Sequence, residues 1–461
     1  MKRAVAISLI IFLTYLRLQS QMYSIGHRTV QPYDISRNRT ITDTEIYYPA
    51  NTAGDNVAVA NGQFPVLVFG HGFTIRWDAY DYIWSYFVPK GYICIFARTE
   101  GNLSPNHGNF GGDLKFLAQW IQQENSNSSS PFFGKVLNKA AVMGHSMGGG
   151  CAYLAASGNN VFTTIVSLAA ANTNPSAITA AQSVSCPVLS IAGAEDCVTK
   201  PNEHQIPIFD SLASSIKYYT ELTGASHCNF TSSGASTCFS AEGISCLGYG
   251  PFISRAVQNS RTLRLAEPWL EFWLKDKCNA WQRFLDTLQT YISNQYLSAN
   301  QQIGNPTMPS AAVPTITLVG NTLQSSPASS YQWYWNGNPI PGATQQTYTP
   351  TQSGNYTVKI TDSNGCTATS APFNYTSTSS FSNFQNQIFI FPNPTQGNLI
   401  HFHSDVNLNN FNYEIMDASG KILQNGKLQN STIDLTGINN GLYIIRLYEK
   451  NFSFISKLIK N

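Results

Sequence analysis

The sequence has 461 residues, more than one ordinary domain, so two or three folded units are expected. Charged residues make up only 11% of the chain, and the formal net charge is +2. Such a chain has no long-range field that would gather a polyanion, which excludes nucleic acid as a partner.

The first twenty residues are typical of a cleavable export signal. Lys2 and Arg3 precede the apolar stretch Ala4–Leu16, and the small residue Ser20 offers a cleavage point. The alternative is a membrane anchor, but this stretch is shorter than the roughly 20 residues that span a bilayer as a helix. We therefore expect residues 1–20 to be removed and the mature protein to be secreted without stable insertion into a membrane.

From residue 21 to residue 300, apolar strand-like runs alternate with helical stretches. This pattern predicts an α/β fold with a mostly parallel sheet covered by helices. Early in this region, the run FPVLVFGHGF ends a strong strand at Val68 or Phe69 and then turns through Gly70 to Phe73.

Residues 137–156, LNKAAVMGHSMGGGCAYLAA, carry the strongest chemical signal in the chain. An apolar strand leads into the pattern G-x-S-x-G and then into an Ala-rich helix, the context of a nucleophile elbow. Glycines flank such a serine because its backbone is strained and packs closely against its neighbours. We predict that Ser146 is the nucleophile and that the backbone N–H groups of Met147 and Phe73 form the oxyanion hole.

The run PVLSIAGAEDCVTKP predicts a buried strand over residues 187–192, followed by a loop that carries Glu195 and Asp196. A carboxylate in this loop can hold the tautomer of a catalytic histidine and stabilise its charged form. Both acidic residues are candidates on this pattern.

The run ELTGASHCNF places His227 in a loop just after the strand expected over residues 216–223. This position matches the order serine, acid, histidine along the chain. His204 is the alternative base, but it lies in an expected helix over residues 202–213, where a packed or solvated histidine is ordinary. His145 is expected to pack in the interior, because a side chain adjacent to the nucleophile in the elbow points away from its hydroxyl.

The C-terminal part of the chain loses helical periodicity. Residues 301–314 are rich in Pro, Ala and Ser and are interpreted as a linker. Residues 315–376 show short alternating strands and resemble the immunoglobulin-like modules of secreted bacterial enzymes, in which Trp333 would be the core tryptophan and Tyr356 the corner tyrosine. Cys366 is the single cysteine there, so the inter-sheet disulfide of antibody domains is absent. A spacer role is favoured over carbohydrate or surface binding.

Residues 377–386 are interpreted as a second linker, and residues 387–461 show another all-β pattern. Three blocks, FPNPTQGNL, MDASGKIL and IDLTGINNGLYIIRL, resemble the C-terminal sorting domain of the type IX secretion system. The resemblance implies type IX secretion machinery as a partner and export to the cell surface or the medium. The fold class expected for the whole chain is therefore an α/β-hydrolase domain followed by two small all-β sandwich domains.

Five blocks of residues 23–277 together resemble the cutinase-like and dienelactone-hydrolase-like branch of the α/β-hydrolases, which includes poly(ethylene terephthalate) hydrolases. The blocks are IGHRTVQPYDISRNRTITDTEIYYPA, FGHGF, GHSMGGG, AGAEDCVTKPNEHQIPIFDSL and GASHCNF. The resemblance implies serine esterase activity and selects Asp196 as the acid. It also implies that Phe73, Met147 and Val198 line the substrate site.

One feature departs from this family pattern. Polyester-cleaving relatives carry a tryptophan between the nucleophile helix and the acid strand, whereas the corresponding run AAANTNPSAIT has no aromatic residue. Trp77, Tyr80 or Phe230 could supply an aromatic surface instead. The esterase prediction stands, and cleavage of aromatic polyesters stays open.

Nine cysteines in an exported chain permit disulfides. Cys197 and Cys228 each directly follow a predicted triad residue, so a disulfide between them would tether the acid loop to the base loop. Cys238 and Cys246 form a second candidate pair. Two cysteines in apolar segments are expected to be buried thiols, Cys94 and Cys151.

The sequence thus predicts a secreted, monomeric serine carboxylic-ester hydrolase that acts on a small or polymeric ester. Ser146 would attack the ester carbonyl, His227 would take the proton, and water would release the acid. No metal or organic cofactor is expected, because P-loop and zinc patterns are absent. The alternatives are an amidase or peptidase on the same scaffold, and a surface adhesin with a vestigial hydrolase domain, against which the intact triad argues.

Overall fold

The computed structural model describes every residue except 1–21, 233–234, 377–387, 405–406, 410 and 450–451. The predicted signal peptide and the predicted second linker therefore lie outside the described residues. The chain divides into two compact units, Met1–Tyr348 with Thr357–Pro372 and Thr349–Tyr356 with Phe373–Asn461. No helix in the described part of the chain is long and apolar enough to cross a membrane.

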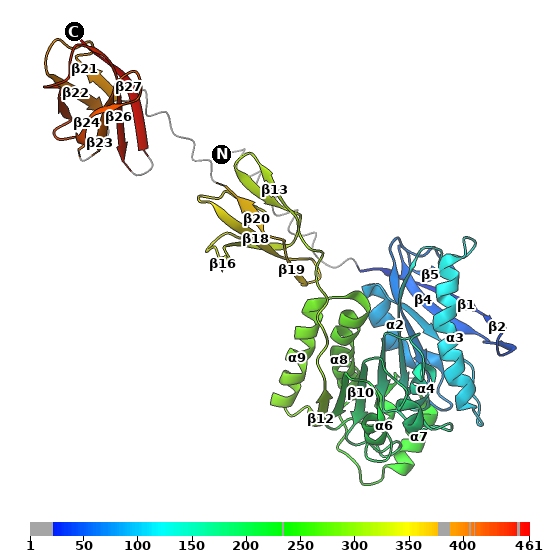
Figure 1. Ribbon diagram of the computed structural model, residues 1–461. Coiled ribbons are helices and arrows are strands. Elements are labelled where there is room, and N and C mark those ends of the chain that lie inside the picture. The colour runs from blue at the N-terminus through cyan, green and yellow to red at the C-terminus, as the bar shows by residue number, and fades with distance from the viewer. Residues whose placement is uncertain (1–21, 233–234, 377–387, 405–406, 410, 450–451) are drawn as a thin grey trace, which may run out of the picture. The chain divides into compact units, whose positions relative to one another are not determined.

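A large sheet forms the centre of the first unit. Its strands in chain order are β1 (Ser24–Val30), β4 (Thr44–Ala50), β5 (Gly54–Asp55), β6 (Phe64–Gly70), β7 (Ile93–Phe96), β8 (Val136–His145), β9 (Thr164–Leu168), β10 (Val188–Gly193), β11 (Lys217–Leu222) and β12 (Leu297–Ile303). Within the described residues the strand order is β12-β11-β10-β9-β8-β6-β7-β4-β1-β5 (Figure 1). The stretch from β11 to β7 is parallel throughout, which confirms the predicted α/β fold with a mostly parallel sheet.

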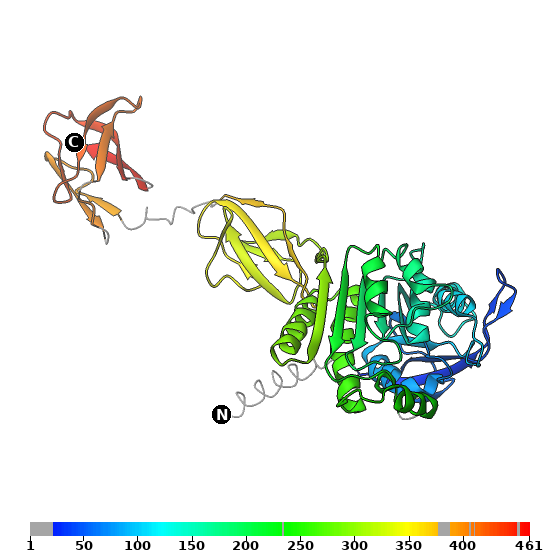
Figure 2. The same cartoon turned by 90° about the horizontal axis from the view of Figure 1, so that it is seen from below.

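Helices cover both faces of this sheet, as Figure 2 shows. Their bounds are α2 (Asp81–Phe87), α3 (His107–Ser126), α4 (Met147–Ala156), α5 (Ala177–Ala181), α6 (Gln205–Ser211), α7 (Ser236–Ser245), α8 (Arg255–Lys275) and α9 (Cys278–Ser293). Side chains alternate along a strand, so Val66 and Val68 of β6 join the core with α3 to α6, whereas Leu67 and Phe69 join the core with α2, α8 and α9. Burial on both faces explains the continuous apolar runs of the central strands.

The edge strand β12 corrects one predicted boundary. It pairs antiparallel with β11 as far as the partners Lys217 and Ile303, so the predicted start of the linker at residue 301 is wrong. The segment LSANQQI is largely exposed at the edge of the sheet and lacks an apolar alternation. This segment is a strand because its backbone pairs with β11. Such pairing at an exposed edge leaves no hydrophobic periodicity in the sequence.

Short strands follow between residues 316 and 375. They are β13 (Ile316–Val319), β14 (Thr322–Ser325), β15 (Ser330–Trp335), β16 (Asn338–Pro339), β17 (Thr347–Tyr348), β18 (Gly354–Thr361), β19 (Thr367–Thr369) and β20 (Phe373–Tyr375). One sheet has the order β13-β14-β17, and the other has the order β16-β15-β18-β19 with β20 on β18. Trp333 is fully buried, and the Tyr356 hydroxyl donates to the Gln352 carbonyl at 2.8 Å, a contact typical of a tyrosine corner. The immunoglobulin-like assignment stays a prediction.

Cys366 has a disulfide partner that the sequence pattern did not suggest. It is bonded to Cys278, the first residue of α9, with a Cα–Cα distance of 5.0 Å. Gly365 beside it has a φ of 77°, and a Cβ there would lie 2.8 Å from the Cβ of Asn279. Glycine therefore lets this turn approach α9 closely enough for the bond.

The second unit contains the C-terminal antiparallel strands. They are β21 (Ile388–Phe391), β22 (Leu399–Ser404), β23 (Asn412–Met416), β24 (Ile422–Lys427), β25 (Thr432–Asp434), β26 (Gly441–Glu449) and β27 (Phe452–Lys460). They form one sheet in the order β21-β22-β25 and another in the order β24-β23-β26-β27. Buried residues such as Ile400, Ile415 and Leu447 form its core, in agreement with the predicted all-β pattern.

Candidate active site

The strand-to-helix turn at Ser146 has the geometry of a nucleophile elbow. Ser146 lies between β8 and α4, and its backbone has φ 56° and ψ −119°. Residues other than glycine rarely adopt this backbone conformation. A Cβ on Gly144 would collide with the backbone of Gly148, and a Cβ on Gly148 would collide with the backbone of Gly70. Glycines at these positions therefore allow β8, α4 and the end of β6 to pack closely enough to hold the strained serine.

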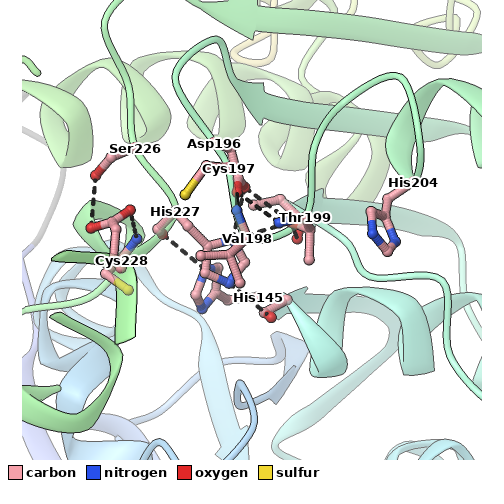
Figure 3. Close-up of polar contacts among 12 residues, drawn as sticks. His145, Asp196, Cys197, Val198, Thr199, His204, Ser226, His227 and Cys228 are labelled. Atoms are coloured by element: carbon pink, nitrogen blue, oxygen red, sulfur yellow. Dashed lines mark hydrogen bonds and ion pairs between the residues drawn. The ribbon is translucent and has the colours of Figure 1, made fainter. Parts of the chain in front are cut away.

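The structure brings together the side chains of Ser146, His227 and Asp196. His227 Nδ1 lies 2.7 Å from Asp196 Oδ2 (Figure 3), and His227 Nε2 lies 2.9 Å from Ser146 Oγ. All three are nearly buried, with exposed fractions of 7%, 2% and 1%. They follow β8, β11 and β10, whose carboxyl ends meet at one edge of the parallel sheet.

The carboxylate of Asp196 is fixed by its own loop. Its Oδ1 accepts the backbone N–H groups of Val198 and Thr199 at 2.9 and 2.8 Å, and the Thr199 hydroxyl lies 2.9 Å from its Oδ2. The other acidic candidate, Glu195, accepts instead the N–H of Gly250 at 3.2 Å. Thr199 is absent from the predicted site, although an aspartate followed closely by threonine is a signal for side-chain-to-backbone turns.

His204 lies away from this arrangement (Figure 3). It directly precedes α6, which begins later than the sequence suggests, at Gln205. Its Nδ1 accepts the backbone N–H of Asn172 at 2.9 Å. This contact gives His204 a local role in holding the loop after β9.

A sequence model described as PET hydrolase-like matches residues 19–249, half of the 461-residue chain. The chain belongs to the PET hydrolase-like family. A second model, described as a secretion system C-terminal sorting domain, matches residues 389–461. The protein is therefore a hydrolase that is secreted or displayed on the cell surface. The predicted resemblances to PET hydrolases and to the secretion sorting domain are confirmed.

In this PET hydrolase-like domain, one predicted oxyanion donor begins a helix and the other lies in the loop after β6. Met147 is the first residue of α4, and the first N–H groups of a helix have no acceptor within it. Phe73 follows Gly72, whose N–H donates to the Tyr80 hydroxyl at 2.9 Å. The residues Phe73 and Val198 are 45% and 41% exposed, so both present apolar surface, whereas Met147 is buried.

The aromatic residues proposed to replace the missing tryptophan differ in exposure. Tyr80 and Phe230 are fully buried, so the expectation that either presents an aromatic surface is wrong. Their rings instead pack around His145 in the core beneath the site. Trp77 is partly exposed, and its ring lies against the guanidinium groups of Arg98 and Arg76, at 4.1 and 4.8 Å.

The predicted disulfide between Cys197 and Cys228 is wrong, as is the pair Cys238 and Cys246. Cys197 is bonded to Cys246, and Cys228 is bonded to Cys238. The reason is the helix α7, which follows the base loop in the chain. Cys238 lies within this helix, and Cys246 directly follows its last residue. The acid loop and the base loop are thus tied to the same short helix. The two predicted buried thiols, Cys94 and Cys151, are free and buried.

The base loop is held by two further polar side chains. The buried carboxylate of Glu242 in α7 accepts the N–H of Cys228 at 3.0 Å and the hydroxyl of Ser226 at 3.3 Å. The buried amide of Gln258 in α8 pairs with the backbone N–H and carbonyl of Ser226 at 3.0 and 2.8 Å. These contacts fix the backbone on both sides of His227, and the sequence pattern did not reveal them.

Proposed function

We propose that the protein is a serine carboxylic-ester hydrolase in which Ser146 is the nucleophile, His227 the base and Asp196 the acid. The observation that carries the proposal is the continuous set of contacts from Asp196 Oδ2 through His227 to Ser146 Oγ, at 2.7 and 2.9 Å. The set ends at a serine held in the strained turn of a nucleophile elbow.

The proposed reaction has two acyl-transfer steps. Ser146 Oγ attacks the ester carbonyl carbon while His227 Nε2 takes its proton, and Asp196 stabilises the imidazolium. The N–H groups of Met147 and Phe73 hold the oxyanion, and His227 returns the proton to the departing alcohol. A water molecule, deprotonated by His227, then attacks the acyl-enzyme and releases the carboxylic acid and free Ser146.

We propose an apolar ester as the substrate class. Phe73 lies in the loop after β6, residues 71–73, which we call the oxyanion loop, and Val198 lies in the acid loop two residues after Asp196. Both residues are apolar and exposed. Burial of an apolar acyl or alcohol chain against such side chains is favourable by about 25 cal/mol per Å². An amidase is the second candidate, because the same triad geometry serves several acyl groups.

Hydrolysis of p-nitrophenyl butyrate by the wild type and by Ser146→Ala tests the proposal. The variant should lose on the order of 10⁴-fold or more in kcat, because the triad acts as a unit. Ser157→Ala, at the end of the same helix, serves as the matched control and should keep full activity. A comparison of p-nitrophenyl esters from acetate to palmitate, an amorphous polyester film and a p-nitroanilide separates the ester from the amide candidate. Substantial activity in Ser146→Ala would place the nucleophile elsewhere.

A further inference from the structure

The buried side chains of Tyr80 and His145 take no part in the proposed reaction, but they connect the oxyanion loop to the base loop. The Tyr80 oxygen accepts the N–H of Gly72 at 2.9 Å and lies 3.0 Å from His145 Nδ1. His145 Nε2 lies 3.1 Å from the backbone carbonyl oxygen of His227. Tyr80 and His145 are both fully buried, so water does not compete for these contacts.

The donor and the acceptor of each hydrogen bond in this chain of contacts can be assigned. A carbonyl oxygen only accepts, so His145 Nε2 carries the proton that it donates to His227. Burial lowers the pKa of His145 well below its usual range, and His227 lowers it further, so the ring is neutral and Nδ1 accepts. Burial raises the pKa of Tyr80, which therefore keeps its proton and donates it to Nδ1.

Gly72 lies directly against this pair. A Cβ on Gly72 would be 3.1 Å from the Tyr80 hydroxyl oxygen and 3.2 Å from His145 Nδ1. The next backbone N–H along the chain is that of Phe73, the proposed oxyanion donor. The Tyr80 hydroxyl thus holds the peptide directly before the one that carries this donor, and the two peptides meet at the α-carbon of Gly72.

His145 also lies beside the proposed base. It directly precedes Ser146, and its ring centroid is 4.7 Å from that of His227. Figure 3 shows the two rings next to each other beneath the acid loop. One neutral histidine thus touches the nucleophile elbow, the base loop and, through Tyr80, the oxyanion loop.

We propose that Tyr80 and His145 are positioning residues that fix the oxyanion donor of Phe73 and the base His227 relative to Ser146. The proposal rests on the proposed function, since it concerns the same site. It assigns a role to His145, which occupies the first x of the G-x-S-x-G pattern, and to Tyr80, which lies 65 positions earlier in the chain.

The test compares Tyr80→Phe with the wild type on p-nitrophenyl butyrate. The variant keeps the ring but leaves Gly72 N–H and His145 Nδ1 without their partner. We expect kcat to fall about 10- to 100-fold while KM changes less than about twofold, because small displacements of catalytic groups act on the reaction step. Tyr153→Phe is the matched control: it removes an equally buried hydroxyl, which contacts Ser167 Oγ at 2.7 Å, and should leave kcat unchanged.

A second pair of variants separates positioning from simple loss of packing. His145→Asn keeps an acceptor for Tyr80 but loses the donor to His227, and His145→Gln keeps a donor for His227 but loses the acceptor for Tyr80. If the contacts act as one chain, Tyr80→Phe combined with His145→Gln should lose no more kcat than the stronger single variant. Multiplied losses would show two independent effects and overturn the proposal.

The remaining outcomes are equally decisive. A kcat of Tyr80→Phe within about twofold of the wild type, or a change confined to KM, would overturn the positioning role. An equal loss in Tyr153→Phe would do the same. Failure of the proposed function is recognised separately, because then the wild type does not hydrolyse the ester or Ser146→Ala still does.

Discussion

The hydroxyl of Thr199 offers a sharp test of how the acid is held. It lies 2.9 Å from Asp196 Oδ2, 3.0 Å from the Ala169 carbonyl oxygen and 3.1 Å from His227 Nδ1. Thr199→Val keeps the shape of the side chain and the backbone N–H that Asp196 Oδ1 accepts, but removes this one donor. A hydrogen bond to a charged group contributes about 1.5–3 kcal/mol.

The expected loss lies at the lower end of this range. Asp196 retains the N–H groups of Val198 and Thr199 and the imidazole of His227 as donors, so it stays in place. About 1.5 kcal/mol of lost transition-state stabilisation corresponds to roughly tenfold in kcat. Removal of the acid function itself, as in Asp196→Asn, should cost about 10⁴-fold.

The assay is the steady-state hydrolysis of p-nitrophenyl butyrate, with Thr199→Ser as the matched control. The serine variant keeps the hydroxyl and should retain kcat within about twofold of the wild type. If Thr199→Val also stays within twofold, or if Thr199→Ser loses as much as Thr199→Val, the hydroxyl does not orient the acid and the reasoning fails.

Three other predictions follow from the same structure. Deletion of residues 389–461 should leave kcat of the purified enzyme unchanged but retain it inside the native cell; normal yield of the truncated protein in the medium would contradict the role of the sorting domain. Replacement of both Cys197 and Cys246 by alanine should lower the free energy of unfolding in urea by about 4 kcal/mol, because the bond spans 49 residues, and a loss under about 1 kcal/mol would argue against a stabilising cross-link. Burial lowers the pKa of Lys275 from 10.5 to about 8. Between pH 8 and pH 10.5 the Lys275 amine is therefore protonated in the unfolded chain and neutral in the folded protein, so its contribution to the free energy of unfolding rises with pH over this interval. Lys275→Met should remove that rise, and identical pH dependence of wild type and variant in urea unfolding would refute it.

The local features of this protein could be predicted from the sequence alone. The glycines around Ser146 indicate a strained turn, because a Cβ at these positions would collide with neighbouring backbone. This need for glycine can be recognised within the short segment itself. Asp196 and His227 were candidates because each follows an apolar strand, and the carboxyl ends of parallel strands meet at one edge. The structure brings these three residues together, whereas the polar strand β12 was missed because an exposed edge needs no apolar pattern.

The pairing of distant side chains was decided only by the tertiary structure. Adjacency to the triad suggested that Cys197 bonds Cys228, but each of them is bonded instead to a cysteine in or next to α7. A disulfide depends on the distance between two Cβ atoms and on the directions of their Cα–Cβ bonds, which the sequence does not report. The contact of Tyr80 with His145 joins residues 65 positions apart and leaves no periodic trace in the sequence. Sequence patterns report what a segment needs locally, while the direction in which a side chain points is set by the packing of elements that are far apart in the chain.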